Sequence, residues 1–155
     1  VEAETKEQGS FLCRNIERQA YQIKMNIYDE KFFRKFAFTE EQIENNIKNA
    51  KRDFEIAEND EYIEVRFTYA YSAMIKAGIA LLSKKELRVR SVPGHHMKII
   101  ESLSRLLKDE AIKIVGEQMR EKRNVGFYLG GSEITEKECR EYLDFVGGII
   151  KQLDS

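Results

Sequence analysis

The hydrophobic positions of this chain recur three and four residues apart over most of its length, which predicts helices. The first clear helix start is Thr39-Glu40-Glu41-Gln42. This is a capping box, in which the threonine hydroxyl accepts from a free backbone N–H and Gln42 reaches back. One apolar face then runs from Ile43 to Ala57. We therefore take residues 39–155 as the main domain.

The stretch Glu61–Leu82 predicts a second helix, with apolar residues on nearly all its sides. A helix of that kind is surrounded by other helices. Small residues on it would let a neighbouring helix approach closely; they are Ala70, Ala73, Ala77 and Gly78. We expect this helix to lie at the centre of a bundle.

The second half of the chain predicts three further helices. Lys84–Val92 reads as a basic loop, after which Pro93 and Gly94 mark a helix start. Apolar residues from Met97 to Leu107 give that helix its buried face, and those from Ala111 to Met119 indicate a fourth helix.

The fourth helix is expected to end near Arg123, because Gly126, Gly130 and Gly131 interrupt its pattern. A second capping box at Thr135 opens a closing helix that reaches Leu153. No alternating strand pattern of any length occurs. The predicted fold class is therefore all-α, an antiparallel bundle of four or five helices.

Residues 1–38 are expected to form a tail and an accessory helix or arm. Residues 1–10 are polar, and apolar residues from Phe11 to Ile27 follow helical spacing. Four phenylalanines come next, and they would be unfavourable in water; they are Phe32, Phe33, Phe36 and Phe38. We expect these rings to pack on the main body.

The composition fits one helix-rich domain with a single core: 155 residues, 42% hydrophobic and 34% charged. Cys13 and Cys139 match no zinc spacing, and we expect both to be reduced thiols. The most apolar run, Phe67–Leu82, is too short to span a membrane and contains Lys76. With no signal peptide evident, a cytoplasmic protein without metal or cofactor is expected.

The net charge of -1 provides no global basic field for nucleic acid, so such binding would need a local patch. Two basic clusters qualify. The first contains Lys84, Lys85, Arg88, Arg90 and Lys98, and the second contains Arg120, Lys122 and Arg123. Taken alone, each cluster is better explained as a solvated connection on the surface.

His95 and His96 follow the Pro-Gly turn and are therefore expected at a helix start. A helix N-terminus favours anions, so the pair either contacts phosphate or forms a cap or surface pair. A metal site is disfavoured, because no third ligand has suitable spacing. Arg123 and Asn124 also allow two interpretations. Arg123 could complement the dipole at a helix end, with Asn124 as a left-handed cap, or the two residues could bind phosphate. Tyr128 alone would be a half-buried aromatic residue.

The order of these features resembles the HEPN family of small helical proteins, from about residue 39 to 153. The resemblance depends on the capped helix, the Ala70–Ala73 segment, Gly-His-His, and Arg123-Asn124 followed by Tyr128. It implies a helical homodimer. Active members are metal-independent endoribonucleases, often toxins paired with a nucleotidyltransferase antitoxin. It assigns Arg123, Asn124 and Tyr128 to the catalytic motif.

Tyr128 departs from the family pattern, which has a histidine at this position. Histidine titrates near neutrality, whereas an unperturbed tyrosine has a pKa of about 10 and is a poor base at pH 7. Either His95 or His96 enters the site from elsewhere in the dimer, or the site binds without cleaving. We therefore expect a HEPN-type nucleotide- or RNA-binding protein in which ribonuclease activity is weak or lost.

Two other interpretations stay open. One is a non-catalytic interaction module that docks a nucleotidyltransferase or another partner protein. The other is a helical domain that resembles the family only in composition, because long amphipathic helices look alike. RNA binding at low salt separates the first expectation from the module.

Overall fold

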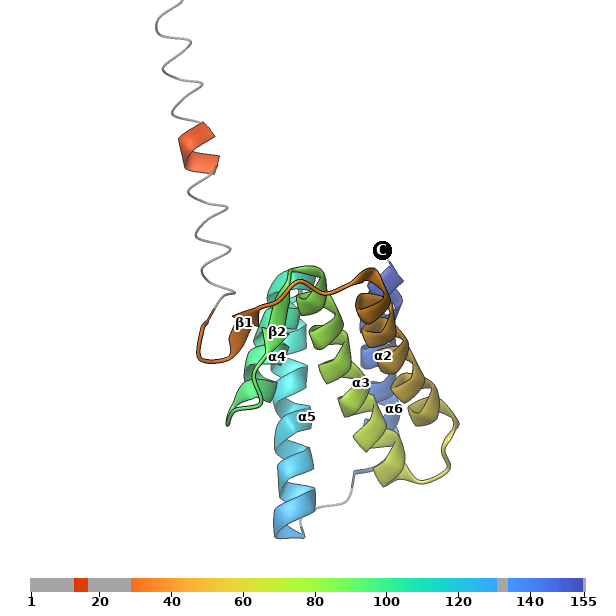
Figure 1. Ribbon diagram of the computed structural model, residues 1–155. Coiled ribbons are helices and arrows are strands. Elements are labelled where there is room, and N and C mark those ends of the chain that lie inside the picture. The colour runs from red at the N-terminus through yellow and green to blue at the C-terminus, as the bar shows by residue number, and fades with distance from the viewer. Residues whose placement is uncertain (1–12, 17–28, 131–133, 155) are drawn as a thin grey trace, which may run out of the picture.

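The fold is an all-α bundle, as the sequence predicted, and its helices surround one central helix (Figure 1). The structure is a computed structural model that describes residues 13–16, 29–130 and 134–154, with only the backbone for 127–129. Most of the expected N-terminal helix thus lies outside the described residues, although 13–16 are helical.

The five long helices follow the predicted order. Their bounds are α2 Glu40–Asn59, α3 Ile63–Lys84, α4 His95–Leu107, α5 Glu110–Leu129 and α6 Glu136–Lys151, followed by the short 3-10 helix η1 Gln152–Asp154. Both predicted capping boxes are present. The Thr39 side chain accepts from the Gln42 N–H at 3.1 Å, and the Thr135 side chain accepts from the Glu138 N–H at 3.1 Å. These hydroxyls satisfy backbone donors that a helix start leaves free.

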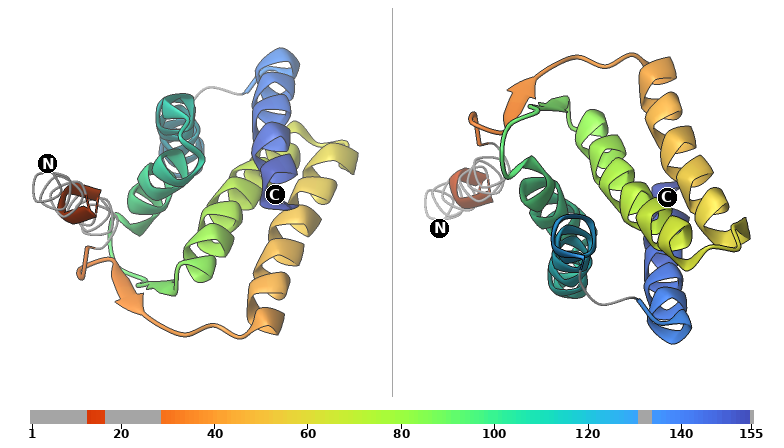
Figure 2. Two further views of the ribbon diagram at one scale, coloured as in Figure 1. Left: turned by 90° about the horizontal axis from the view of Figure 1, so that it is seen from above. Right: turned by 90° about the horizontal axis from the view of Figure 1, so that it is seen from below.

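Helix α3 is the central element. It lies between α4 on one side and α2 with α6 on the other (Figure 2). The expected small residues are all buried, and a Cβ added to Gly78 would clash with Ile99 of α4. The close approach of α3 and α4 therefore depends on the absence of a side chain at residue 78.

One carboxylate is buried between α2 and α3. Asp53 is 1% exposed and accepts from the Ser72 hydroxyl at 2.7 Å, with the Lys76 ammonium at 2.6 Å. Burial alone would raise the pKa of this carboxyl, but hydrogen bonds from Lys76, Ser72 and Arg52 together lower it. The buried charge is thereby paired and hydrogen-bonded, as such groups must be.

A small sheet is a departure from the sequence prediction. Strand β1 (Phe33–Lys35) pairs antiparallel with β2 (Leu87–Val89), beside α4 (Figure 1). Lys84–Val92 is thus not one loop, since it includes the end of α3 and all of β2. A three-residue strand is too short to show a period-2 pattern, which explains why sequence analysis did not predict it.

Phe32 and Phe33 pack on the main body, as expected, beside Leu82 and Leu87. Phe36 and Phe38 are only half-buried, and their rings form an edge-to-face pair with centroids 4.7 Å apart. Residues 29–38 therefore contribute a second, smaller hydrophobic cluster next to the main core.

Helix α5 is longer than predicted. It continues through Arg123, Asn124 and Gly126 to Leu129, and Gly130 caps it with a φ of 57°. The interpretation of Arg123 and Asn124 as a helix end is therefore wrong. Gly126 is exposed, and a Cβ added to it would meet nothing within 4 Å; the residue lowers helix propensity without ending the helix.

Candidate phosphate-binding pocket between α4 and α5

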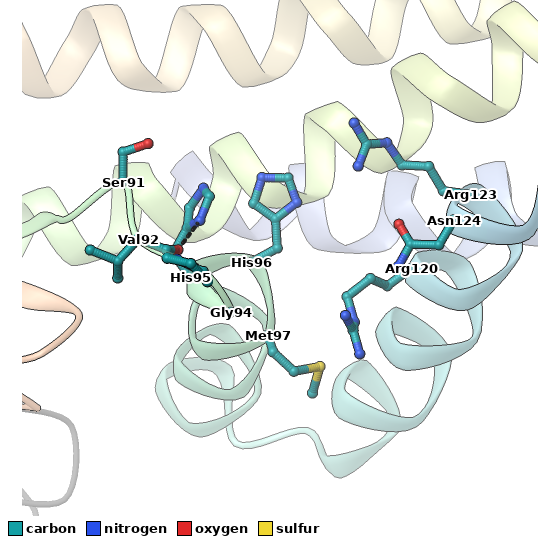
Figure 3. Close-up of a pocket in the computed structure, with 10 residues that line it drawn as sticks. Ser91, Val92, Gly94, His95, His96, Met97, Arg120, Arg123 and Asn124 are labelled. Atoms are coloured by element: carbon teal, nitrogen blue, oxygen red, sulfur yellow. Dashed lines mark hydrogen bonds between the residues drawn. The ribbon is translucent and has the colours of Figure 1, made fainter. Parts of the chain in front are cut away.

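A pocket of about 500 Å³ lies between the start of α4 and the second half of α5 (Figure 3). It brings together residues that are some 25 positions apart in the sequence. Ser91 to Met97 line one side, and Arg120, Arg123 and Asn124 line the other. Among the described residues that line it, none is acidic.

The start of α4 provides one wall. Gly94 has a φ of 84°, a left-handed conformation that glycine tolerates best, and no side chain caps the helix. The first turn also carries no acidic residue. The free N–H groups and the positive end of the helix dipole therefore lie at the pocket, where an anion would be stabilised.

His95 has a defined tautomer when neutral. Its Nδ1 lies 2.7 Å from the Val92 carbonyl oxygen, which can only accept, so Nδ1 carries the proton and donates (Figure 3). In the uncharged ring Nε2 is then a free acceptor. His95 also packs edge-to-face against His96, with ring centroids 4.5 Å apart.

His96 is uncharged at neutral pH. Burial, followed by the nearby charges of His95, Arg123 and Arg120, lowers its pKa from 6.5 to about 4. Its Nδ1 lies 3.0 Å from the Tyr71 hydroxyl. Because burial raises the pKa of Tyr71 despite the opposing effect of Arg123 and Arg120, the phenol keeps its proton.

Tyr71 does not line the pocket but contacts one residue from each of its walls. This side chain of α3 is 2% exposed, and the Arg123 guanidinium lies over its ring at 5.3 Å from the centroid. Tyr71 thus contacts His96 from α4 and Arg123 from α5. Figure 3 shows the Arg123 guanidinium extending toward the side of the pocket that His96 occupies, whereas Arg120 points toward Met97.

Arg120 contributes an available donor. Its Nε is buried and has no hydrogen-bond partner among the described residues. A buried N–H without a partner is costly, and an anionic ligand at this position would satisfy it.

The other predicted site residues do not line this pocket. Lys122 is held by Glu138 of α6, with Nζ 3.1 Å from Oε1. Lys84 donates to the Leu153 carbonyl at 3.2 Å, and with Lys85 it lines a different pocket of about 310 Å³. Arg88 lies on β2 and Arg90 just after it, where both are exposed.

Tyr128 lies in α5, but its side chain falls outside the described residues. The sequence did not single out Tyr71, Ser91 or Met97 as part of this site. Tyr71 was noted only within the Ala70–Ala73 segment, since nothing local distinguishes a buried tyrosine that supports a site from one that fills a core. Among the described residues, no group of three or more potential ligands could hold a metal ion, and no helix could span a membrane.

Comparison with models of known protein families, with curated proteins and with solved structures found no match to this chain.

Proposed function

We propose that this protein binds RNA and that the pocket between α4 and α5 holds a phosphodiester group. The observation that carries the proposal is that Arg120 and Arg123 line the same pocket as the uncapped start of α4. Guanidinium groups bind phosphate through charge-assisted, two-pronged hydrogen bonds. None of the described lining residues is acidic, which favours a positive potential in the pocket.

The histidines give the pocket a group suited to cleavage without metal. In the uncharged ring, the free Nε2 of His95 accepts the proton of a ribose 2′-hydroxyl. The 2′-oxygen then bonds to phosphorus, and the bond from phosphorus to the 5′-oxygen breaks. The 5′-oxygen takes a proton from water, while Arg123 stabilises the added negative charge. Histidine from α4 thus takes the role that Tyr128 is poorly suited to fill.

The HEPN resemblance adds further proposals about the biology. It favours a homodimer, a nucleotidyltransferase as partner and a cytoplasmic location. The pocket described above is formed within one chain, so RNA binding does not depend on these additional proposals.

The first test is binding of fluorescently labelled single-stranded RNA, measured by anisotropy. We expect Arg123→Ala to weaken binding by roughly 10- to 100-fold, because a charged hydrogen-bonding group contributes about 1.5–3 kcal/mol. Arg123→Lys should recover only part of the loss, since it keeps the charge but not the planar fork. Arg140→Ala, which changes an exposed residue of α6, is the matched control and should bind like wild type.

The second measurement is cleavage of the same RNA in the presence of a chelator. His95→Ala should abolish cleavage and change binding by less than about threefold, because the arginines remain. If the Arg123→Ala variant binds RNA like wild type, the pocket is not the RNA site. No binding of wild type at low salt would instead favour the protein-interaction module.

A further inference from the structure

The two-stranded sheet carries an exposed pair of arginines directly opposite each other. Arg34 of β1 and Arg88 of β2 are cross-strand partners, and both are exposed. Neither forms an ion pair with another described residue. Like charges at this spacing repel each other. The arrangement therefore destabilises the isolated sheet and would be relieved by an anion lying across it.

The alternation of the strands places these arginines on the outer face. Phe33 and Leu87 are buried against the body, so Arg34 and Arg88, one position along each strand, point to solvent. Arg90 follows β2 and is also exposed. Residues 86–90 contain a single acid, Glu86. The outer face thus presents a row of guanidinium groups.

Aromatic rings lie beside this row. The Arg88 guanidinium is 5.5 Å from the centroid of Phe36, whose ring forms the edge-to-face pair with Phe38. Both rings are half-buried, so part of each is open to solvent. Flat aromatic and guanidinium groups next to a basic row are what proteins use to stack unpaired bases while contacting the phosphates.

The row leads into the pocket. Val89 is the last residue of β2, and the chain passes through Arg90 directly to Ser91 and Val92, which line the pocket wall. The Arg90 N–H donates to the Phe32 carbonyl at 2.6 Å, and the Phe32 ring lies next to Gly94. The end of β2 and the pocket wall are therefore adjacent along the chain, and Phe32, which precedes β1, lies near both.

We infer that the outer face of the β1–β2 sheet binds single-stranded RNA and guides the strand into the pocket between α4 and α5. This inference rests on the proposed function and adds the substrate class. Arg34, Arg88 and Arg90 contact phosphates, and bases stack on Phe36 and Phe38. Double-stranded RNA does not fit, because its bases are already stacked and paired.

The test measures anisotropy of a labelled 12-nucleotide uridine-rich RNA across a salt series. The double variant Arg34→Gln, Arg88→Gln should bind roughly tenfold more weakly, and its salt slope should fall by about 1.4, from about 0.7 for each lost phosphate contact. The matched control is Lys48→Gln, Lys137→Gln, which removes the same charge from exposed positions of α2 and α6. The control should stay within about twofold of wild type.

A second readout uses the absence of tryptophan from the chain. The variant Phe36→Trp introduces a single tryptophan, and stacking of a base on it should quench its fluorescence when the 12-nucleotide RNA is added. Phe36→Leu keeps apolar packing but removes the ring, and should weaken binding by about fivefold or more. Circular dichroism melting shows whether each variant folds. If Phe36→Leu does not fold, the fluorescence of Phe36→Trp alone tests base stacking at residue 36.

A dinucleoside monophosphate separates this inference from the proposed function, because it is long enough only for the pocket. Its binding should be lost in Arg123→Ala and unchanged in the Arg34, Arg88 variant. If the Arg34, Arg88 variant binds the 12-nucleotide RNA like wild type while Arg123→Ala does not, RNA binding by the sheet is refuted and RNA binding by the pocket is retained. Equal binding of a 12-base-pair duplex refutes the preference for single strands. If wild type binds neither ligand, the proposed function and this inference fall together.

Discussion

Tyr71 connects the two walls of the pocket. Its hydroxyl lies 3.0 Å from the His96 Nδ1, and its ring lies under the Arg123 guanidinium. One buried residue of α3 thus positions a side chain from α4 and one from α5. Because α3 is the central helix, the spacing between the imidazole and the guanidinium is fixed by the core of the bundle.

At this scale we predict a pH dependence of stability that comes from His96. Its pKa is about 4 in the fold and 6.5 in the unfolded chain, so between these values the unfolded state binds more protons. The contribution of the neutral ring is complete above pH 6.5 and is lost as the pH falls through 4. The groups facing the ring are His95, Tyr71, Arg120 and Arg123.

The measurement is urea unfolding of wild type and His96→Asn from pH 4 to 7.5. Asparagine retains an acceptor for Tyr71 but does not titrate in this range. Relative to the variant, wild type should lose up to about 1.4 kcal/mol per pH unit near pH 5, the effect of one proton. Parallel stability curves for the two proteins would contradict the lowered pKa.

The helices show how packing decides the effect of a single residue type. Gly78 of α3 and Gly148 of α6 both lie inside helices, where glycine lowers helix propensity. Gly78 faces Ile99 of α4 at a distance that leaves no room for a Cβ, whereas nothing lies within 4 Å of a Cβ added at Gly148. Identical substitutions should therefore have opposite effects.

We predict that Gly78→Ala destabilises the protein by about 1–3 kcal/mol, because α3 and α4 must separate or Ile99 must leave its rotamer. Gly148→Ala should stabilise it by about 0.5–1 kcal/mol through helix propensity alone. Urea unfolding of both variants provides the comparison. If Gly78→Ala stabilises as much as Gly148→Ala, the contact between α3 and α4 is looser than described.

On the scale of the whole molecule, residues 29–38 join the N-terminal side of the chain to the bundle. Phe33 is 1% exposed and belongs to the cluster with Leu82 at the end of α3 and Leu87 on β2. The proposed RNA surface on the sheet therefore depends on this cluster, which holds β1 in register with β2.

We predict that Phe33→Ala lowers the free energy of unfolding by about 3–4 kcal/mol, as large core truncations do. Phe38→Ala removes a half-buried ring and should cost less than half as much. Thermal melting compares the two variants, and RNA binding by folded Phe33→Ala should weaken as β1 loses its support. An equal small effect of both changes would mean that residues 29–38 are only loosely attached.

The sequence was sufficient for the elements whose signals are local. Thr39 and Thr135 start helices because their hydroxyls satisfy nearby N–H groups, and α3 is central because its apolar residues cover most of its sides. The end of α5 was misplaced because Gly126 weakens a helix without stopping it, whereas Gly130 caps it in a left-handed conformation. Strands of three residues left no pattern to read.

The amino-acid sequence by itself determined the all-α class, the helix order and the presence of arginines and histidines suited to phosphate. Only the tertiary structure decided which of these residues meet. Packing of α4 and α5 against α3 brings His95 and His96 to Arg120 and Arg123, and directs Lys122 to Glu138 and Lys84 to Leu153. Sequence patterns predict helices because a helix depends on residues that are neighbours in the chain. A site depends on distances between residues on different helices, and only the packing of the core sets those distances.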